Sequence, residues 1–361
     1  MGIPVKLDSK LQILPLSERN YDDWNRYVSN HPQATPYHNA AWQVATKSAY
    51  NMQYAGLVAI RVEDNSIVGV APAIKLKSWF LGERLCALPY CDVGFPIADS
   101  DEIAQYLVSQ LSALNPSAKY IEVRDCFNGV ASDPTTLVGK KVQMRLALPE
   151  SSDVLLKSFK SKLRSQIKKA DKNGLTSREG NSLQLISDFY SVYSKNMRDL
   201  GSPVHSLSWF VDIANNYATS CFVNVVYYND IPIGAGIVLK NREKASIPWA
   251  STLREFNKLA PNMKLYWNVL AHCADSGIRE FDFGRSTFNE GTFKFKKQWG
   301  AQPYLLDWYG YPRSVSAPQN NEAAEDGFKA KIKSLLVQTW RMLPLKFTVA
   351  LGSKIRPHIS L

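Results

Sequence analysis

The largest group of side chains that could take part in catalysis or ligand binding lies in one C-terminal stretch, residues 281–300, FDFGRSTFNEGTFKFKKQWG. An apolar run leads into Gly284, a Ser/Thr pair and then a lysine-rich segment. Open α/β sheets place ligands where a strand ends in a polar turn. Fixed cations act most strongly on a phosphate or a developing oxyanion, and we expect Arg285 and Lys296 to take that role. The alternative is a structural ion pair between Asp282 and Arg285.

The remaining polar residues of this stretch complete the expected site. Glu290 is either a carboxylate at a helix start or a proton acceptor, and it joins Lys296 and Arg285 as a catalytic candidate. The candidate substrate-binding residues within the stretch are Asp282, Ser286, Thr292 and Trp299.

A second group of cations lies on a helix predicted over 153–172. Its basic residues recur every four positions and form one stripe, Lys160, Arg164, Lys168 and Lys172. Like charges at this spacing destabilise a helix by about 0.2–0.5 kcal/mol per pair, and an anionic ligand would remove that repulsion. A solvated face opposite an apolar core stripe is the alternative. We take Arg164 and Lys168 as candidate substrate-binding residues.

The histidines and cysteines provide fewer candidates for catalysis or ligand binding. His38 and His205 occupy equivalent positions of an internal repeat, which favours a capping role, although His205 is kept as a candidate substrate-binding residue. The sequence has no Ser-His-Asp or Cys-His order, no metal-ligand set and no GxGxxG or GxxxxGK[ST] fingerprint. Five scattered cysteines without CxxC indicate reduced, buried thiols and a cytoplasmic protein.

The internal repeat sets the domain organisation. Residues 35–50, TPYHNAAWQVATKSAY, align without gaps to residues 202–217, SPVHSLSWFVDIANNY. After a two-residue slip, 58–71 aligns to 223–236, each an apolar strand, an Asx-rich turn and a second strand. We expect two copies of one α/β domain, over 1–148 and 149–312, followed by a polar linker over 313–327.

The overall charge points to an anionic partner. The formal net charge is +11, and seven basic residues but no acidic ones follow Asp326. The tail, 328–361, combines these cations with apolar side chains, as does a helix on an anionic membrane surface; packing on the second domain through Trp340 is the alternative. The start of the chain has no signal-peptide pattern, and no run of about 18 apolar residues occurs. We therefore expect a cytoplasmic protein that can lie peripherally at the inner membrane.

Several motifs together resemble the FemAB-like proteins of the GNAT superfamily, closest to the branch associated with exosortase-type exopolysaccharide systems. DFGRS followed by FKxxWG is the most specific part, and the basic helix is weaker. The matching stretches span nearly the whole chain: YHNAAW (37–42), VGVAPAIKLKSWFLGERLCALPY (68–90), SQIKKADKNGL (165–175), MRDLGSPVHS (197–206), FDFGRS (281–286), GTFKFKKQWG (291–300) and WRMLPL (340–345).

This resemblance implies tandem, duplicated GNAT-like domains with mixed central sheets. It implies transfer of an acyl or aminoacyl group to an amine of a phosphate-bearing cell-envelope or saccharide precursor, with the active site in the second copy. Lys296 would stabilise the acyl centre, and the basic helix would face phosphates. No bound cofactor or metal is implied; the co-substrate is acyl-CoA or aminoacyl-tRNA. The sequence lacks the [QR]xxGx[GA] pyrophosphate loop and a long coiled-coil insertion, which leaves the donor open.

Two other classes of function compete with transfer. A non-catalytic, membrane-associated scaffold for polysaccharide assembly fits the tail and the scarcity of catalytic residues. Nucleic-acid binding for its own sake is disfavoured, because the basic stripe lacks the interleaved aromatic residues on which bases stack. A tRNA would bind only as a donor.

Overall fold

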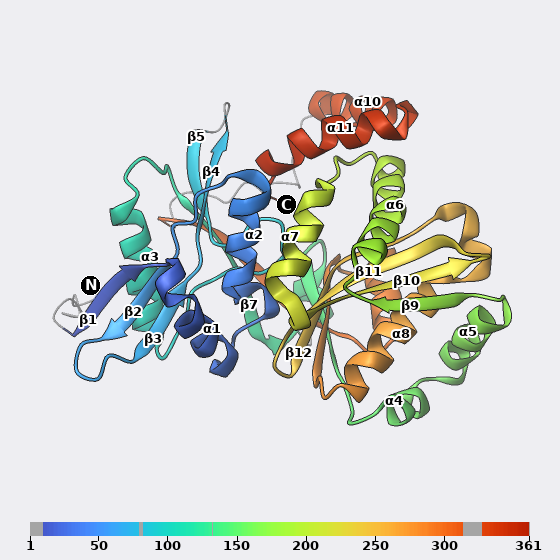
Figure 1. The fold of residues 1–361 in the computed structure, drawn as a ribbon, viewed down its shortest axis with the longest axis horizontal. Coiled ribbons are helices and arrows are strands. Elements are labelled where there is room, and N and C mark those ends of the chain that lie inside the picture. Colours follow the sequence, from blue (N-terminus) through green and yellow to red (C-terminus); the bar gives the residue numbers. More distant parts are fainter. Residues whose placement is uncertain (1–9, 79–81, 132, 313–326, 361) are drawn as a thin grey trace. The chain divides into compact units, whose positions relative to one another are not determined.

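The computed structural model describes residues 10–78, 82–131, 133–312 and 327–360, without the side chains of 78, 128, 134 and 327–333. The chain divides into two compact units (Figure 1). Unit 1 comprises 1–126, 307–320 and 358–361, and unit 2 comprises 127–306 and 321–357. The chain passes between the units within strands β7 (Ile121–Val130) and β14 (Gln302–Tyr311).

Unit 1 is built on short strands with helices on both faces of its sheet. A sheet in the order β1-β2-β3-β6 is antiparallel. Strands β4 and β5 form an antiparallel hairpin, and β7 pairs with β5 in parallel. Its further elements are β1 (Leu11–Pro15), α1 (Tyr21–Asn30), α2 (Ala40–Tyr50), β2 (Leu57–Arg61), β3 (Ile67–Ala71), β4 (Ile74–Ser78), β5 (Gly82–Cys86), β6 (Ile97–Ala98) and α3 (Asp101–Leu114).

Alternation along β2 explains why both faces of this sheet are covered. Leu57 and Ala59 pack in one apolar cluster with Leu107 of α3, whereas Val58 packs in another with Val28 of α1. Successive strand side chains point to opposite faces, so an unbroken apolar run such as this one needs a helix on each side.

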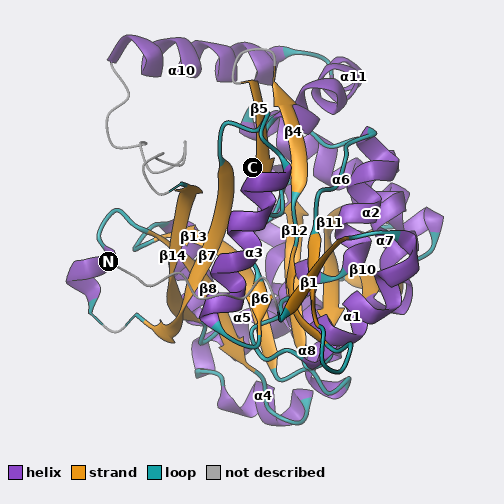
Figure 2. Ribbon diagram, turned by 90° about the vertical axis from the view of Figure 1, so that its left-hand side faces the viewer, coloured by secondary structure: helices purple, strands orange, loops and turns teal. Residues whose placement is uncertain are grey.

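Unit 2 has a longer sheet, in the order β14-β8-β13-β12-β11-β10-β9 (Figure 2). Its pairs are antiparallel except β12 with β13. The elements are β8 (Lys141–Ala147), α4 (Ser152–Ser158), α5 (Ser161–Lys172), β9 (Thr176–Gly180), α6 (Leu183–Leu200), α7 (Leu207–Tyr217), β10 (Cys221–Tyr228), β11 (Ile231–Asn241), β12 (Lys244–Thr252), α8 (Pro261–Asp275), β13 (Glu280–Thr287), α9 (Gly291–Gln298), α10 (Gly327–Met342) and α11 (Leu345–Ile355).

The two units repeat one order of elements, strand, two helices, antiparallel strands, helix and strand, as the sequence repeat predicts. Helices α2 and α7 occupy the same positions of the aligned segments. The hairpin turns that follow them contain Asn65 and Asn229, both with positive φ. The α/β fold in tandem, with mixed sheets, is therefore confirmed.

The division between the units differs from the boundary expected at 148. Strand β8 precedes that boundary in sequence, yet it pairs with both β13 and β14 of unit 2. The last residues of the chain, 358–361, belong to unit 1. The predicted linker, 313–327, lies outside the described residues except for Gly327, where α10 begins.

Two further expectations need correction. The histidines do not cap α2 and α7: Asn39 accepts from the Ala41 N–H to cap α2, and Ser206 accepts from the Trp209 N–H to cap α7. His38 instead accepts the Thr35 N–H at 3.1 Å in the capping box of the short 3-10 helix Pro36–His38. The helix predicted over 153–172 is two helices, because Phe159 adopts extended backbone and packs edge-on against Trp299.

The tail forms helices α10 and α11, which pack on α6 within unit 2 (Figure 1). Gly201, with φ +77°, ends α6 and lies against Val337 of α10. Gly352 of α11 lies so close to Val204 that an added Cβ would be 2.8 Å from its backbone nitrogen. Trp340 is half-buried, so the tail has a face packed on unit 2. None of the helices in the described residues is long and apolar enough to cross a membrane.

Candidate functional site

Strand β13 carries a bulge in the middle of the predicted site. Its register with β8 shifts between Asp282, opposite Arg145, and Arg285, opposite Gln143, so Phe283 and Gly284 face a single residue. Gly284 has φ +77°, a conformation that glycine adopts without steric cost. The Asp282 carboxylate accepts the Gly284 N–H at 2.8 Å and so fixes the bulge from within the strand.

The neighbouring strand β12 has a bulge at the same level. Its register with β11 shifts between Ser246 and Trp249, at Ile247 and Pro248. The parallel ladder between β12 and β13 ends at Ser246 and Asp282, immediately before both bulges. Within the described residues, the two strands therefore pair only at their first residues and then part. Pro248 has no N–H, which suits a position where a ladder is interrupted.

Lys296 connects helix α9 to the bulge of β13. Its side chain is buried, and Nζ donates to the carbonyl oxygens of Gly284 at 3.0 Å and Arg285 at 2.8 Å. A bulge removes carbonyls from the regular ladder, and a buried carbonyl needs another donor. Lys296 thus positions the strand on which Arg285 lies and places a positive charge next to the gap.

Polar side chains of the neighbouring strands β8 and β12 surround the carboxylate of Asp282. Gln143 donates to its Oδ2 at 2.7 Å, and Ser246 does so at 3.3 Å. Arg145 donates in turn to the Gln143 side chain at 2.7 Å, and its guanidinium lies 4.6 Å from the centre of the Tyr304 ring. Sequence reasoning missed the β8 residues, although Gln143 and Arg145 alternate with apolar residues of that strand.

Two candidate residues carry buried polar atoms that have no hydrogen-bond partner in the described structure. They are the hydroxyl of Ser286 on β13 and the indole N–H of Trp299 at the end of α9. Trp299 packs against Phe159 and Tyr266, so its ring belongs to the core of unit 2. Buried polar atoms in folded proteins normally have hydrogen-bond partners.

The other residues predicted in this stretch are more open to solvent. Arg285 is half-buried, whereas Glu290 and Thr292 are exposed at the start of α9. Glu290 stands at the N-cap position without a side-chain capping bond. A carboxylate there is stabilised by the helix dipole and remains accessible to a substrate.

The basic stripe is only partly available to a ligand. Arg164 donates to the carbonyls of Lys157 and Phe159, at 3.3 and 2.6 Å, and so closes the junction of α4 and α5. Lys168 is exposed. Asp171, the one acid on the helix, pairs with Lys264 of α8 at 2.5 Å. Arg164 is thus a structural residue here, and the exposed lysines remain candidates for binding phosphates.

His205 lies inside an aromatic cluster that includes Trp249, the residue after the β12 bulge. Its ring stacks on Trp209 and meets Phe210 and Trp249 edge-on. Burial, and secondarily the charge of Arg356, hold the pKa of His205 well below its usual value of 6.5. A neutral histidine in such surroundings supports the core.

The described residues contain no group of His, Cys, Asp and Glu side chains that could hold a metal ion. All five cysteines are free and buried, as predicted. Burial raises the pKa of the Cys86, Cys221 and Cys273 thiols to about 12, which disfavours the reactive thiolate. The candidate site is therefore one of cations and backbone groups.

Comparisons with known proteins agree with this geometry. The acetyltransferase (GNAT) domain family matches residues 157–297, which include α5, the gap between β12 and β13, and Lys296. No curated protein matches the sequence. Among solved structures, FemX is similar over 82% of this chain and 95% of its own, with a TM-score of 0.61 and 14% identity.

Two further structures share the fold. The C-terminal domain of a putative lysylphosphatidylglycerol synthetase from Agrobacterium fabrum has a TM-score of 0.52 and 12% identity, covering 89% of this chain and 95% of that one. L-PGS from Bacillus licheniformis has a TM-score of 0.52 and 9% identity, covering 91% and 98%. Residues 157–297 of the chain thus match the acetyltransferase (GNAT) domain family, and most of the chain shares its fold with these three structures.

Proposed function

We propose that the protein transfers an acyl or aminoacyl group onto an amine of a cell-envelope or exopolysaccharide precursor. The observation that carries this proposal is the parting of β12 and β13 at two adjacent bulges. Backbone groups beyond the end of a ladder can bond an extended ligand as a further strand would. An acyl thioester arm or an aminoacyl ester has the extended shape and the carbonyl acceptors for such a place.

The reaction needs charge stabilisation more than acid–base residues. The amine nitrogen attacks the carbonyl carbon, a C–N bond forms, and the C–S or C–O bond to the donor breaks. The negative charge that develops on the carbonyl oxygen is stabilised by Arg285 and by the charge of Lys296 behind the bulge. The nitrogen releases a proton, to Glu290 or to solvent, and the leaving group takes one up. Positioning of the two reactants supplies the remaining rate enhancement.

The acceptor in this proposal carries phosphate. Lys168 and Lys172 on α5, and Lys160 immediately before it, are exposed within the matched domain, and such a group of cations favours an anionic ligand. The similarity in fold to FemX and to a domain of a putative lysylphosphatidylglycerol synthetase supports an envelope precursor as acceptor. The donor is acyl-CoA or aminoacyl-tRNA.

A transfer assay tests this function and distinguishes the donors. Purified protein is incubated with an amine-bearing, phosphate-containing acceptor and either acyl-CoA or aminoacyl-tRNA, and the amide product is quantified by mass spectrometry. Lys296→Ala should lower the rate about 10²–10³-fold, the loss typical of a removed oxyanion-stabilising group. Lys294→Ala, which removes an exposed lysine of the same helix, is the matched control. Unchanged turnover in Lys296→Ala would remove this residue from the mechanism.

The tail gives the protein a second partner, an anionic membrane surface. Apolar side chains of α10 and α11 are exposed while the other face packs on α6: Leu335, Leu336, Met342, Phe347 and Leu351. Exposed cations, Arg341, Lys346 and Lys354, lie among them. An apolar face bordered by cations binds headgroups and acyl chains together. Such binding would bring the enzyme to a lipid-linked acceptor at the inner membrane.

The same exposed face favours the alternative function, a non-catalytic scaffold for polysaccharide assembly at the membrane. Flotation with vesicles that contain phosphatidylglycerol separates the two functions. We expect Phe347→Glu and Leu351→Glu to abolish flotation while transfer to a water-soluble acceptor persists. Flotation that depends on these residues, in a protein with no transfer from either donor, would favour the scaffold.

A further inference from the structure

The registers of the two units show that unit 1 has its own copy of the strand gap. In unit 1, Ile74 of β4 pairs with Cys86 of β5, and Leu76 pairs with Arg84. In unit 2, the pairs between β11 and β12 are Leu239 with Ser246 and Asn241 with Lys244. Cys86 therefore corresponds to Ser246.

The parallel ladders agree with this correspondence. In unit 1 the ladder between β5 and β7 ends at Cys86 and Glu122. In unit 2 the ladder between β12 and β13 ends at Ser246 and Asp282. Each gap thus begins beside a buried carboxylate of the second strand, Glu122 or Asp282. The position of Gly284, the bulge residue of unit 2, is occupied in unit 1 by Arg124.

In unit 1 the chain itself fills the gap. The loop over 87–96 leaves β5, and Gly94 exchanges two backbone hydrogen bonds of 2.8 Å with Arg124 of β7. Leu88 atoms lie 2.7–2.8 Å from where a Cβ of Gly94 would be, so only glycine fits this approach. The Trp42 side chain holds the loop by donating to the Pro89 carbonyl at 2.9 Å.

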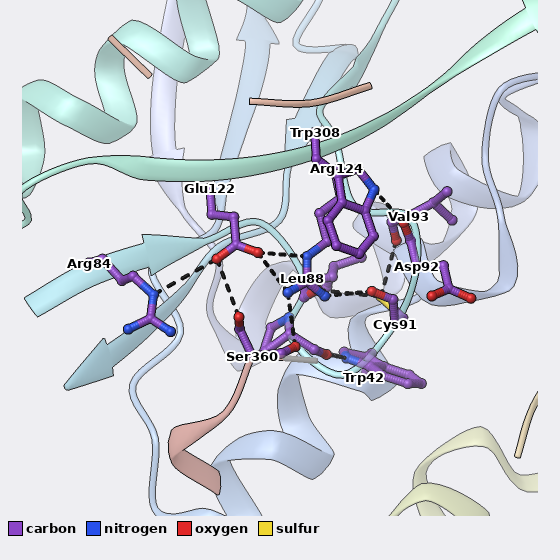
Figure 3. A network of polar contacts seen from close by, with 11 residues as sticks. Trp42, Arg84, Leu88, Cys91, Asp92, Val93, Glu122, Arg124, Trp308 and Ser360 are labelled. Carbon is purple, nitrogen blue, oxygen red and sulfur yellow. Dashed lines mark hydrogen bonds and ion pairs between the residues drawn. The ribbon is translucent and has the colours of Figure 1, made fainter. Parts of the chain in front are cut away.

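Residues near the end of the sequence complete the filling (Figure 3). The carbonyl of Ser360 accepts the Tyr90 N–H at 2.6 Å and Nη2 of Arg124 at 2.9 Å. The Ser360 hydroxyl donates to Glu122 at 3.4 Å. Tyr90 lies in the loop beyond Cys86, where the ladder between β5 and β7 ends. A backbone carbonyl of the chain's own segment that follows the 3-10 helix Arg356–His358 is thus bound where unit 2 has its candidate gap.

The groups that hold Ser360 are fixed in advance. Arg124 is completely buried; it donates to Glu122 at 2.7 and 2.9 Å and to the Cys91 carbonyl at 2.5 Å. The Trp308 ring lies 4.8 Å from its guanidinium carbon (Figure 3). Tyr90 has φ +69°, a strained conformation for a bulky residue, and such strain clusters at ligand-binding positions.

We propose that unit 1 is a peptide-binding unit, and that its site, equivalent to the acyl-donor gap of unit 2, is occupied by residues 358–360 of the same chain. The ligand class is a peptide, recognised by a backbone carbonyl through the Tyr90 N–H and Arg124. Unit 1 takes up no acyl donor while this segment is bound. The inference rests on the repeated register and on these hydrogen bonds, so it holds whether or not unit 2 transfers acyl groups.

A peptide-binding experiment tests this proposal. The chain lacking residues 358–361 is titrated into a fluorescein-labelled peptide with the sequence of residues 354–361, KIRPHISL, and fluorescence anisotropy is measured. We expect saturable binding to the shortened chain and at least tenfold weaker binding to the full chain, whose own segment competes. Arg124→Met in the shortened chain should abolish binding, and a scrambled peptide should not bind.

Thermal denaturation covers the case in which the shortened chain is poorly folded alone. A ligand that binds only the folded state raises Tm with concentration, so the peptide should restore Tm in trans. The proposal would be overturned if the peptide caused no change in anisotropy and no increase in Tm. Equal binding to the full and shortened chains would also overturn it, as would equal binding of the scrambled peptide.

Discussion

The two units contain the same gap between parallel strands in two different states. In unit 2, β12 and β13 part at paired bulges, and Lys296 from α9 holds the carbonyls of the second bulge. In unit 1, β5 and β7 part at the equivalent pair, but a loop, Arg124 and Ser360 fill the space. One copy of a duplicated domain can therefore keep the geometry for a ligand while the other uses it to bind its own chain.

The largest effect should come from removing the charged side chain of Arg124, which fills the unit 1 gap. Arg124→Met leaves Glu122 buried without its closest cation, and breaking a buried ion pair costs about 3–5 kcal/mol. Urea denaturation should show that loss in the free energy of unfolding, with transfer per folded molecule retained. Arg26→Met, which removes an exposed surface pair with Asp23, should cost less than about 1 kcal/mol. Equal effects of the two substitutions would mean that the buried network is not what stabilises unit 1.

A smaller effect should distinguish the bulge of unit 2 from an ordinary turn. Gly284→Ala forces a Cβ into left-handed backbone, at a cost of about 1–2 kcal/mol. Gly277→Ala imposes the same strain at φ +82°, in a turn with no atom within 4 Å of the new Cβ. Both variants should lose similar stability in thermal denaturation, but only Gly284→Ala should lower kcat. An equal decrease in kcat for the two variants would show that the bulge has no specific role in catalysis.

The aromatic cluster of unit 2 should make stability depend on pH through His205. The folded-state pKa of His205 is lowered by burial, so the unfolded state binds the proton more tightly. Its contribution to stability is complete above pH 6.5 and is lost as pH falls, by up to about 1.4 kcal/mol per pH unit. His205→Phe should flatten the dependence of the unfolding free energy on pH between 6.5 and 5. An unchanged slope would show that His205 is not buried as a neutral residue.

Much of this organisation follows from the sequence. The shared pattern of 35–50 and 202–217 predicts α2 and α7, and the apolar spacing predicts α3 over the residues it occupies. Local signals fix such elements because helix periodicity and turn residues act over a few positions. The DFGRS stretch predicts a strand that ends in a polar turn at Gly284, whereas β13 continues through its bulge to Thr287 and so carries Arg285.

The rest depends on contacts that are distant in sequence. Nothing near Lys296 indicates that its Nζ donates to two carbonyls of a bulge, because the bulge arises from pairing with β8. The network of Glu122 and Arg124 includes Ser360, more than two hundred residues away. Phe159 ends α4 because of Trp299, which a helical pattern over 153–172 does not predict.

Hydrogen–deuterium exchange with bound donor tests most directly whether unit 2 has the functional gap. Acyl-CoA or aminoacyl-tRNA is added to the full chain, and amide protection is compared between 247–252 with 283–287 in unit 2 and 87–94 with 122–124 in unit 1. We predict donor-dependent protection in the unit 2 segments alone. Protection confined to the unit 1 segments would contradict this assignment of the two gaps.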